Sequence, residues 1–360
     1  MQVPHVDLGA GNRPVAFRPT AQKLDFLWLE LTNRCNLRCV HCYTESSPWT
    51  GDDDALTAAD YERLMREAFD LGCRKIQLIG GEPQLNRDFH YLLVTAKTIG
   101  FEFIEVFTNL TQLTEATIRY AADNGICFAT SVYSDTPEGH DAVTQVRSSH
   151  TRTVKNLNRL IERGITTRAA TIVVDHDQAH AERTRAFLTG LGVGRVRASE
   201  VREFGRGETL LSRPAQLDGL CGHCWAGKLC IAPDGTAYPC VMARHWPVGN
   251  VLQQSLAEIV AGRQLAGMRQ TIFDEVWQPK LTAGRAETHE GLAMACEPNG
   301  GPPPIPEDLC EPSTCWPCPQ ECVPDETSPP CPQACVPFPA CAPEDGPCSP
   351  DGSSCEPFPQ

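Results

Sequence analysis

The sequence predicts an α/β fold built on a parallel sheet. Six segments of strand-like composition alternate with segments of helical periodicity between residues 24 and 201. Successive parallel strands need a long crossover connection, and the helical segments supply one between each pair. In parallel sheets of this kind, ligands bind at the carboxyl ends of the strands. That edge is therefore where we expect a functional site.

The first strand, residues 24–31 (LDFLWLEL), alternates and is rich in large apolar side chains. Thr57 to Asp60 has the form of a capping box and begins a helix that extends to about Leu71. Residues 75–79 then form a short strand that leads directly into Gly80. The same order repeats, with helices predicted over 88–99, 115–123, 151–163 and 180–191, and strands over 102–107, 126–132, 167–174 and 195–201.

A change of composition after Arg206 marks the end of this alternation. Residues 215–262 hold four cysteines around a Pro-Asp-Gly turn and end in a predicted helix, which indicates a small second domain. Residues 263–295 give weak helical signals and are interpreted as a linker. Residues 1–22 are polar and interrupted by Pro and Gly, which predicts an N-terminal arm.

Residues 296–360 hold ten cysteines and nineteen prolines, a composition from which no core can form, so we expect a disordered C-terminal tail. Eight of these cysteines stand in Cys-x-Pro, where proline presents each thiol on a stiff extended segment. Three interpretations stay open: an acidic tail without specific chemistry, metal or cluster binding by a subset of the thiols, and a protein-interaction arm. The subset considered is Cys310, Cys315, Cys318 and Cys322.

The charge of the chain is concentrated in its tail. The formal net charge is −14, but residues 296–360 hold eleven acids and no base, whereas residues 1–295 hold 34 acids and 31 bases. A nearly neutral body without a basic stripe argues against nucleic acid as a partner. The sequence has no apolar run long enough to span a membrane and no secretory signal at residues 1–20. We therefore expect a cytoplasmic protein with reduced thiols.

Three thiols directly follow the first strand: Cys35, Cys39 and Cys42. Without a secretory signal, this grouping favours a shared metal over a disulfide framework. A [4Fe-4S] cluster normally takes four thiolates, so three leave one iron open to a small molecule. A structural zinc site would instead need four ligands near one another, and His41 is too close in the chain to be an obvious fourth.

The spacing of these cysteines, with three and then two residues between them, resembles the cluster motif of the radical S-adenosylmethionine (SAM) superfamily. His41 occupies the usual aromatic position of that motif. The resemblance implies a partial (β/α)6 barrel over residues 23–207, a [4Fe-4S] cluster on the three cysteines and SAM on the open iron. The alternative is a structural metal knuckle in an unrelated fold.

A second match to the superfamily, its SAM-binding glycine motif, ends the second strand. Glycine lets a strand end pass close to a ligand, and a glutamate can accept from an ammonium group. The superfamily uses this strip for the SAM amino group, whereas a plain strand-to-loop turn is the alternative. The four residues are Gly80, Gly81, Glu82 and Pro83. Other rim positions expected to contact the cofactor are Asn109, Ser131 and Arg202.

The four cysteines of the second domain form a complete metal-ligand set around a turn: Cys221, Cys224, Cys230 and Cys240. This stretch resembles the auxiliary-cluster half of the SPASM or twitch extension of radical SAM enzymes, which implies an auxiliary [4Fe-4S] cluster. A zinc ribbon is the alternative, because four thiolates on turns serve zinc equally well. No cysteine follows Val251 for 44 residues, so a second auxiliary cluster would need ligands from the tail.

The resemblance implies an enzyme that reductively cleaves SAM to a 5′-deoxyadenosyl radical, which abstracts a substrate hydrogen. Similar extensions occur in enzymes that modify ribosomally made peptides by crosslinking, epimerisation or oxidation, so a peptide is the first substrate class. The alternatives are an oxidoreductase or epimerase for a small molecule such as a sugar or aminocyclitol, and a non-catalytic metal-binding scaffold. An electron donor such as flavodoxin or ferredoxin is implied. The sequence assigns no catalytic residue, although Cys127 as a hydrogen-atom donor is a hypothesis.

Overall fold

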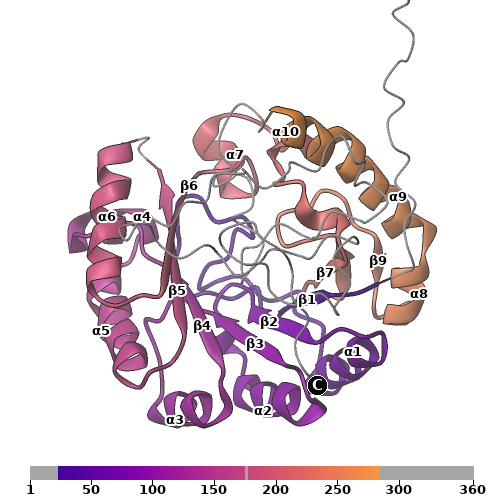
Figure 1. Ribbon diagram of the computed structural model, residues 1–360, viewed down its shortest axis with the longest axis horizontal. Helices are drawn as coiled ribbons and strands as arrows, with labels where there is room; N and C mark the ends of the chain where they lie inside the picture. Colours follow the sequence, from indigo (N-terminus) through magenta and orange to yellow (C-terminus); the bar gives the residue numbers. More distant parts are fainter. Residues whose placement is uncertain (1–22, 175–176, 284–360) are drawn as a thin grey trace, which may run out of the picture. The chain divides into compact units, whose positions relative to one another are not determined.

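The computed structural model describes residues 23–174 and 177–283. The predicted N-terminal arm, the last part of the predicted linker and the whole Cys-x-Pro tail lie outside the described residues. The described part contains one sheet of nine strands in the order β6-β5-β4-β3-β2-β1-β7-β8-β9, which stays open between its edge strands β6 and β9 (Figure 1).

Six strands pair in parallel, each with its neighbour in the sequence. They are β1 (Phe26–Glu30), β2 (Lys75–Ile79), β3 (Phe103–Phe107), β4 (Cys127–Ser131), β5 (Thr167–Val173) and β6 (Arg195–Glu200). Each lies within two residues of its predicted bounds. The α/β class with a parallel sheet is therefore confirmed.

The helices between these strands lie on the outer side of the curved sheet (Figure 1). They are α1 (Ala58–Asp70), α2 (Phe89–Ile99), α3 (Glu115–Asn124), α4 (Pro137–Thr144), α5 (Ser149–Glu162) and α6 (Gln178–Gly190). The capping box at α1 is confirmed, because the Thr57 side chain accepts from the Asp60 backbone and the Asp60 side chain accepts from the Thr57 backbone. Alternation along β1 shows the two faces of the sheet: Leu27 and Leu29 join the core beneath the helices, whereas Trp28 lines the inner cavity.

Two helices were not predicted from the sequence, α4 and α7 (Arg206–Leu211). Both are short, so the apolar periodicity that identifies longer helices has too few turns to show. The helix α4 does carry a local start signal, because the Thr136 side chain caps it and Pro137 stands at its first turn.

The cysteine-rich segment extends the same sheet. Strand β7 (Lys228–Ile231) pairs in parallel with β1, and β8 (Thr236–Tyr238) and β9 (Gly249–Asn250) continue the sheet antiparallel. The 3₁₀ turn η3 (His223–Trp225) precedes β7. The parallel pair places Cys230 of β7 opposite Trp28 of β1.

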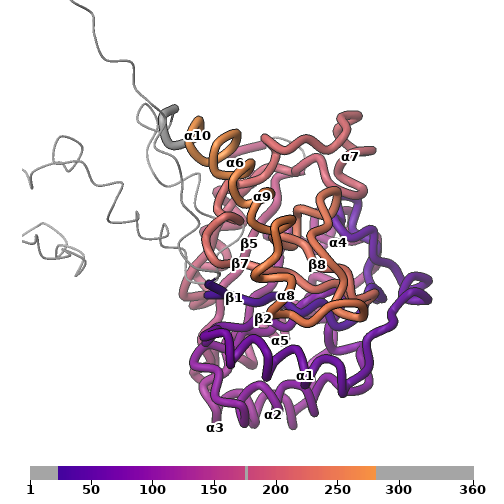
Figure 2. Tube along the Cα trace, turned by 90° about the vertical axis from the view of Figure 1, so that its right-hand side faces the viewer, coloured from indigo at the N-terminus to yellow at the C-terminus, as the bar shows by residue number. Residues whose placement is uncertain are grey.

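Helices follow β9 as far as the described residues extend. They are α8 (Leu256–Ala261), α9 (Arg263–Ile272), the π-helical turn η4 (Phe273–Trp277) and α10 (Gln278–Ala283). Figure 2 shows α8 to α10 following one another along the side where β7 and β8 lie. The weak helical signals in the predicted linker thus correspond to regular helix up to Ala283. Buried side chains such as Leu265, Ile272 and Phe273 hold this region against the sheet domain.

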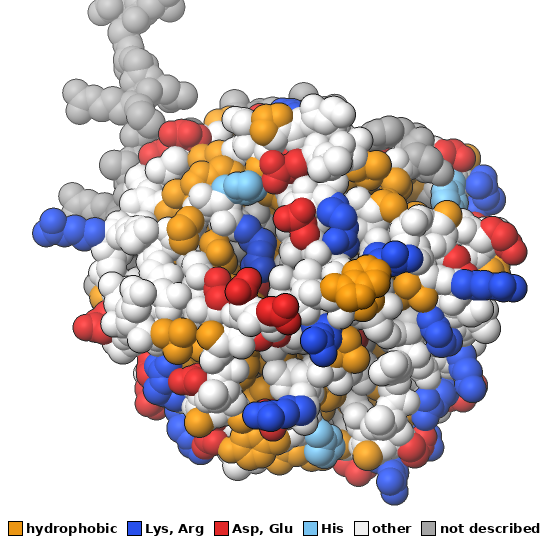
Figure 3. Space-filling view, turned by 180° about the vertical axis from the view of Figure 1, so that it is seen from behind, with side chains coloured by type: hydrophobic (Ala, Val, Ile, Leu, Met, Phe, Trp, Pro, Cys, Tyr) orange, Lys and Arg blue, Asp and Glu red, His pale blue; other side chains and the backbone are white. Residues whose placement is uncertain are grey.

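The described surface carries both signs of charge. On the face in Figure 3, Lys and Arg side chains are interspersed with Asp and Glu and with hydrophobic side chains. This mixture agrees with the nearly balanced charge of residues 1–295. No helix in the described ranges is long and apolar enough to cross a membrane.

Candidate active site

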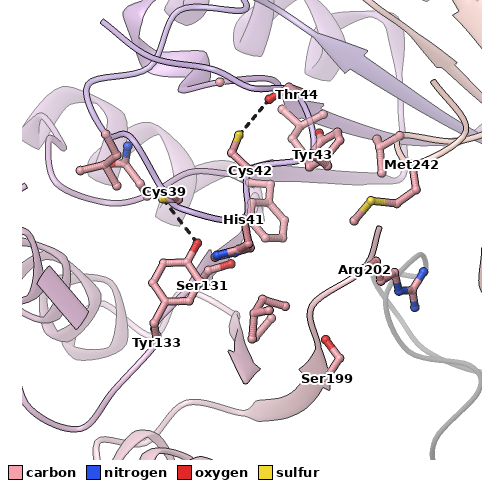
Figure 4. Close-up of a pocket in the computed structure, with 18 of the residues that line it drawn as sticks. Cys39, His41, Cys42, Tyr43, Thr44, Ser131, Tyr133, Ser199, Arg202 and Met242 are labelled. Carbon is pink, nitrogen blue, oxygen red and sulfur yellow. Dashed lines mark hydrogen bonds between the residues drawn. The ribbon is translucent and has the colours of Figure 1, made fainter. Parts of the chain in front are cut away.

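A cavity of about 220 Å³ lies at the carboxyl ends of the parallel strands. Ile79, Phe107, Ser131 and Glu200, from the ends of β2, β3, β4 and β6, all line it. The structure brings nine of the predicted site residues together in its lining: Cys35, Cys39, His41, Cys42, Gly80, Gly81, Asn109, Ser131 and Arg202. Figure 4 labels Cys39, His41, Cys42, Ser131 and Arg202 among them. Their ligand roles stay predictions, but their convergence on one cavity is a finding.

The loop that carries the three cysteines is anchored at both ends. At its start, the Thr32 hydroxyl and the Asn33 backbone N–H both donate to the Asp54 carboxylate. At its end, the guanidinium of Arg206, the first residue of α7, donates to the carbonyl oxygens of Cys39 and Ser46, both at 2.8 Å. The contact of Arg206 with the cysteine loop was not predicted, because Arg206 stands 167 residues from Cys39 in the sequence.

The thiols of this loop lie in surroundings that disfavour a bare thiolate. Burial raises the pKa of Cys39 to about 12 and also raises the pKa of Cys35. A cation bound at the site would reverse this preference, because a metal ligated by sulfur deprotonates the thiol. Thiolates are soft ligands that match iron. Three such donors around one cavity, with open space beside them, fit a [4Fe-4S] cluster with one free iron position.

Two ring nitrogens in the same lining support a bound polar ligand. Nδ1 of His41 and Nε2 of His140 are buried, and neither has a hydrogen-bond partner among the described residues. Burial lowers the pKa of each imidazole to about 4, so both rings are neutral near pH 7. Buried polar atoms without partners are rare in folded proteins, so these two atoms indicate room for a ligand with hydrogen-bonding groups.

Gly80 and Gly81 make room for the cysteine loop. A Cβ at Gly80, whose φ is +136°, would lie 2.5 Å from the Thr32 carbonyl oxygen, and one at Gly81 would overlap the Arg34 carbonyl oxygen. The backbone N–H of Gly81 donates to Thr32 at 2.8 Å. The glycines therefore hold the loop against the end of β2, a role beyond the ligand contact expected of them.

Glu82 lies behind the cavity, outside its lining. Its carboxylate is 1% exposed and accepts hydrogen bonds from the Thr108 hydroxyl at 2.7 Å and the Asn109 backbone N–H at 2.8 Å. Burial raises its pKa. Glu82 thus fixes the end of β3, where Asn109 faces the cavity. Pro83 is also buried outside the lining, at the start of the turn η1 (Pro83–Leu85), so for both residues a direct SAM contact stays a prediction.

A polar cluster that the sequence analysis missed crosses the inner face of the sheet. Arg168 of β5 donates twice to Glu105 of β3, at 2.8 and 2.7 Å, and Gln77 of β2 donates to the same carboxylate. Gln77 and Arg168 line the cavity, whereas Glu105 is 2% exposed. A bidentate ion pair of this kind holds the side chains of Arg168 and Glu105 in a fixed orientation. The available signal was the central polar residue of two short strands, Gln77 in β2 and Glu105 in β3.

The four cysteines of the second predicted metal site are all buried. The sulfurs of Cys224 and Cys240 lie 2.7 Å apart. Cys230 stands on β7, next to the strand that lines the cavity. Within the described ranges, no three His, Cys, Asp or Glu side chains are arranged to hold a single metal ion. The ligand set proposed from the spacing is therefore a prediction for this site.

Comparison with protein families decides the assignment. The model of the radical SAM superfamily matches residues 29–188, and the model of SPASM, an iron–sulfur cluster-binding domain, matches residues 214–286. Residues 29–188 therefore form a radical SAM domain, and residues 214–286 form a SPASM domain. This assignment implies a [4Fe-4S] cluster and SAM as cofactors, and the SPASM domain implies auxiliary iron–sulfur binding.

Several known proteins are similar to parts of this chain. The antilisterial bacteriocin subtilosin biosynthesis protein AlbA of Bacillus subtilis is 25% identical over 270 residues, which cover 64% of this chain and 58% of AlbA. A probable GTP 3′,8-cyclase of Methanothermobacter thermautotrophicus is 41% identical over 87 residues, covering 24% of this chain and 28% of the cyclase. The chain thus spans less than two thirds of these relatives.

Two solved structures share the fold. Streptococcus suis SuiB bound to the precursor peptide SuiA superposes with a TM-score of 0.57 at 16% identity, covering 69% of this chain and 67% of SuiB. Native anSMEcpe with bound AdoMet and the Cp18Cys peptide superposes with a TM-score of 0.53 at 14% identity, covering 69% of this chain and 83% of the other. At these identities the likeness shows a shared fold and nothing further.

Proposed function

We propose that the protein is a radical SAM enzyme that reductively cleaves SAM and abstracts a hydrogen atom from a ribosomally made peptide. The observation that carries the proposal is the single cavity at the carboxyl ends of the strands, which unites Cys35, Cys39 and Cys42 with Gly80 and Gly81. The three thiolates would hold a [4Fe-4S] cluster. When bound, this cluster and SAM supply a 5′-deoxyadenosyl radical for hydrogen abstraction.

The chain's own residues would bind and orient the reactants. His41 and Asn109 would present polar atoms to the bound groups, and Arg202 in the same lining would offer a cation to a carboxylate such as that of SAM. Trp28, Phe107 and Phe204 give the cavity an apolar lining that limits the access of water. Exclusion of water protects a reactive radical from side reactions.

A peptide is the proposed substrate class because two similar proteins act in that context. AlbA is a bacteriocin biosynthesis protein, and the SuiB structure contains a precursor peptide. The SPASM match adds a proposed auxiliary cluster on Cys221, Cys224, Cys230 and Cys240, close to the cavity strand β1. A low-potential one-electron donor of the flavodoxin or ferredoxin class is the proposed partner for reduction.

Anaerobic reconstitution with iron and sulfide, followed by addition of SAM and dithionite, tests the enzyme proposal. We expect 5′-deoxyadenosine from the native chain and none from Cys39→Ala. Cys127→Ala is the matched control, because Cys127 lies outside the cavity lining, and it should retain its iron and SAM cleavage. A fully iron-loaded protein that forms no 5′-deoxyadenosine would contradict the proposal.

The substrate class needs a separate experiment. The loaded enzyme is incubated with SAM and either candidate precursor peptides or small sugars and aminocyclitols, and the products are examined by mass spectrometry. A mass change in a peptide that depends on SAM supports the proposal. Turnover of a small molecule with unchanged peptides would replace the peptide class with the alternative one.

A further inference from the structure

Each of the three cysteine sulfurs in the cavity has a side-chain hydrogen-bonding group beside it, from a different part of the chain. The Tyr133 hydroxyl lies 3.9 Å from Cys39 Sγ, and the Thr44 hydroxyl lies 3.2 Å from Cys42 Sγ (Figure 4). Nδ2 of Asn109 lies 3.8 Å from Cys35 Sγ. These three groups are named the sulfur-bonding groups, because each lies within hydrogen-bonding distance of a cysteine sulfur.

Tyr133 is held in place by two histidine rings. Its ring centroid lies 5.0 Å from that of His41 and 5.3 Å from that of His140, and its backbone N–H donates to His140 Nδ1 at 3.2 Å. A phenolic hydroxyl, with an ordinary pKa of about 10, carries its proton at neutral pH. Tyr133 therefore offers a proton to the Cys39 sulfur from a fixed ring.

The orientation of Asn109 is set by its other contacts. Its side-chain oxygen accepts from the backbone N–H of Thr111 at 2.9 Å and from the Thr111 hydroxyl at 2.7 Å. The amide nitrogen must then face the other way, toward the Cys35 sulfur and Asn36 Oδ1, which is 2.7 Å from it. Cys35 also accepts from the Leu37 backbone N–H at 3.4 Å.

The hydroxyl of Thr44 also forms a hydrogen bond with that of Ser46. The hydroxyl oxygen of Ser46 lies 2.7 Å from it, and Ser46 in turn donates to Asn33 Oδ1 at 2.9 Å. Because the one proton of Ser46 goes to Asn33 in this arrangement, the Thr44 hydroxyl donates to Ser46. A thiolate has no proton and can only accept, so beside a ligated Cys42 the Thr44 hydroxyl donates to the sulfur once Ser46 turns its proton from Asn33 to Thr44. Every sulfur of the motif thus has a hydroxyl or amide group placed beside it by the surrounding structure.

We propose that the sulfur-bonding groups set the reduction potential of the iron–sulfur cluster on the three cysteines. Tyr133, Thr44 and Asn109 are thus positioning residues. This inference rests on the proposed function. A donor places positive charge next to a ligand sulfur and so stabilises the cluster with one more electron. Loss of a donor therefore moves the potential to more negative values and makes reduction harder.

A redox titration without SAM, followed by electron paramagnetic resonance of the reduced cluster, tests the proposal. Tyr133→Phe removes one hydroxyl and keeps the ring, and Thr44→Val is similar in shape to threonine. Each should shift the midpoint potential to more negative values, and the double variant should shift it further. Tyr91→Phe is the matched control, because the exposed Tyr91 hydroxyl donates to Glu62 and should leave the potential unchanged.

A second readout identifies the proton itself. After exchange into deuterated water, pulsed resonance on the reduced native cluster should detect a coupled exchangeable deuteron, and Tyr133→Phe should lose part of this signal. If Tyr133→Phe cannot be loaded with iron, Thr44→Val alone decides by its shift.

The outcomes separate this inference from the proposed function. Loaded variants with the native potential overturn the inference and leave the enzyme proposal intact. Shifted potentials in a protein that cleaves no SAM uphold the inference and contradict the enzyme proposal. A native chain that binds no iron–sulfur cluster overturns both.

Discussion

Nη1 of Arg244 lies 2.7 Å from Oε2 of Glu30, which joins the SPASM segment to the end of β1. The Glu30 side chain is 1% exposed, and its other oxygen accepts from the Tyr43 hydroxyl at 3.0 Å. Tyr43 directly follows Cys42, so one buried carboxylate connects the cysteine loop, the first strand and the second cysteine-rich region.

Replacing Arg244 by methionine should destabilise the protein strongly. The change leaves the Glu30 carboxylate buried without its cation, which costs about 3–5 kcal/mol. Urea denaturation measures the loss. Arg185→Met is the control, because Arg185 and Glu182 form an exposed pair worth about 0–1 kcal/mol. Equal effects of the two substitutions would contradict the role assigned to the buried pair.

Gly81→Ala should weaken metal binding at the cysteine loop. The added Cβ overlaps the Arg34 carbonyl oxygen, so the loop must move away from β2. Overpacking of this kind costs about 1–3 kcal/mol. Iron bound per chain after reconstitution should fall, whereas Gly190→Ala, whose Cβ would meet no atom within 4 Å, should bind as much iron as the native chain. Full iron loading of Gly81→Ala would show that the loop tolerates the displacement.

Arg206→Met should loosen the cysteine loop while the sheet stays folded. The guanidinium makes two hydrogen bonds to loop carbonyls, and bonds to a charged group contribute about 1.5–3 kcal/mol each. Backbone hydrogen exchange should accelerate over residues 39–46 and remain slow in β2 and β3. If exchange over residues 39–46 is unchanged, other contacts must anchor the loop.

Acid should destabilise the metal-free protein in part through His140. Burial, with the neighbouring His150, lowers the folded pKa of His140 to about 4 from 6.5, whereas Asp141 opposes the shift. Between these pH values His140 binds a proton in the unfolded chain but not in the folded chain. The free energy of unfolding therefore falls as pH decreases from 6.5 to 4. The slope from one such group is about 1.4 kcal/mol per pH unit.

His140→Gln tests this dependence, because glutamine keeps an acceptor for the Tyr133 N–H but does not titrate. Urea denaturation at pH 7, 6 and 5 should show a shallower loss of stability in the variant than in the native chain. Parallel pH profiles for the two proteins would assign the acid sensitivity to other groups, with His41 as the first candidate, since burial also lowers its pKa to about 4.

Cys224→Ala should remove iron from the SPASM segment and leave the cysteine loop loaded. Cys224 is buried with its sulfur 2.7 Å from that of Cys240, so its loss opens the proposed ligand set. Iron and sulfide per chain should fall by about one [4Fe-4S] cluster relative to the native protein. Zinc without sulfide in the native SPASM segment would establish the zinc-ribbon alternative.

The order of the six parallel strands and of the longer helices between them was predictable, because each of these elements carries a local pattern. Alternating or continuous apolar residues mark the strands, and the Thr57 capping box marks the start of α1. The pairing of β7 with β1 was not predictable in this way. These strands are about 200 residues apart in the sequence, and only their packing brings them side by side.

The sequence by itself determined the α/β class through the alternation of strands and helices. It determined the radical SAM assignment through the spacing of Cys35, Cys39 and Cys42 and through Gly80 to Pro83. These signals are local, because ligands of one cluster and a tight strand end must lie near one another along the chain. Only the tertiary structure decided what surrounds the sulfurs: Tyr133 reaches Cys39 across 94 residues, and Asn109 reaches Cys35 across 74. Contacts between distant residues leave no spacing pattern, since the fold alone sets which strand ends meet around the cavity.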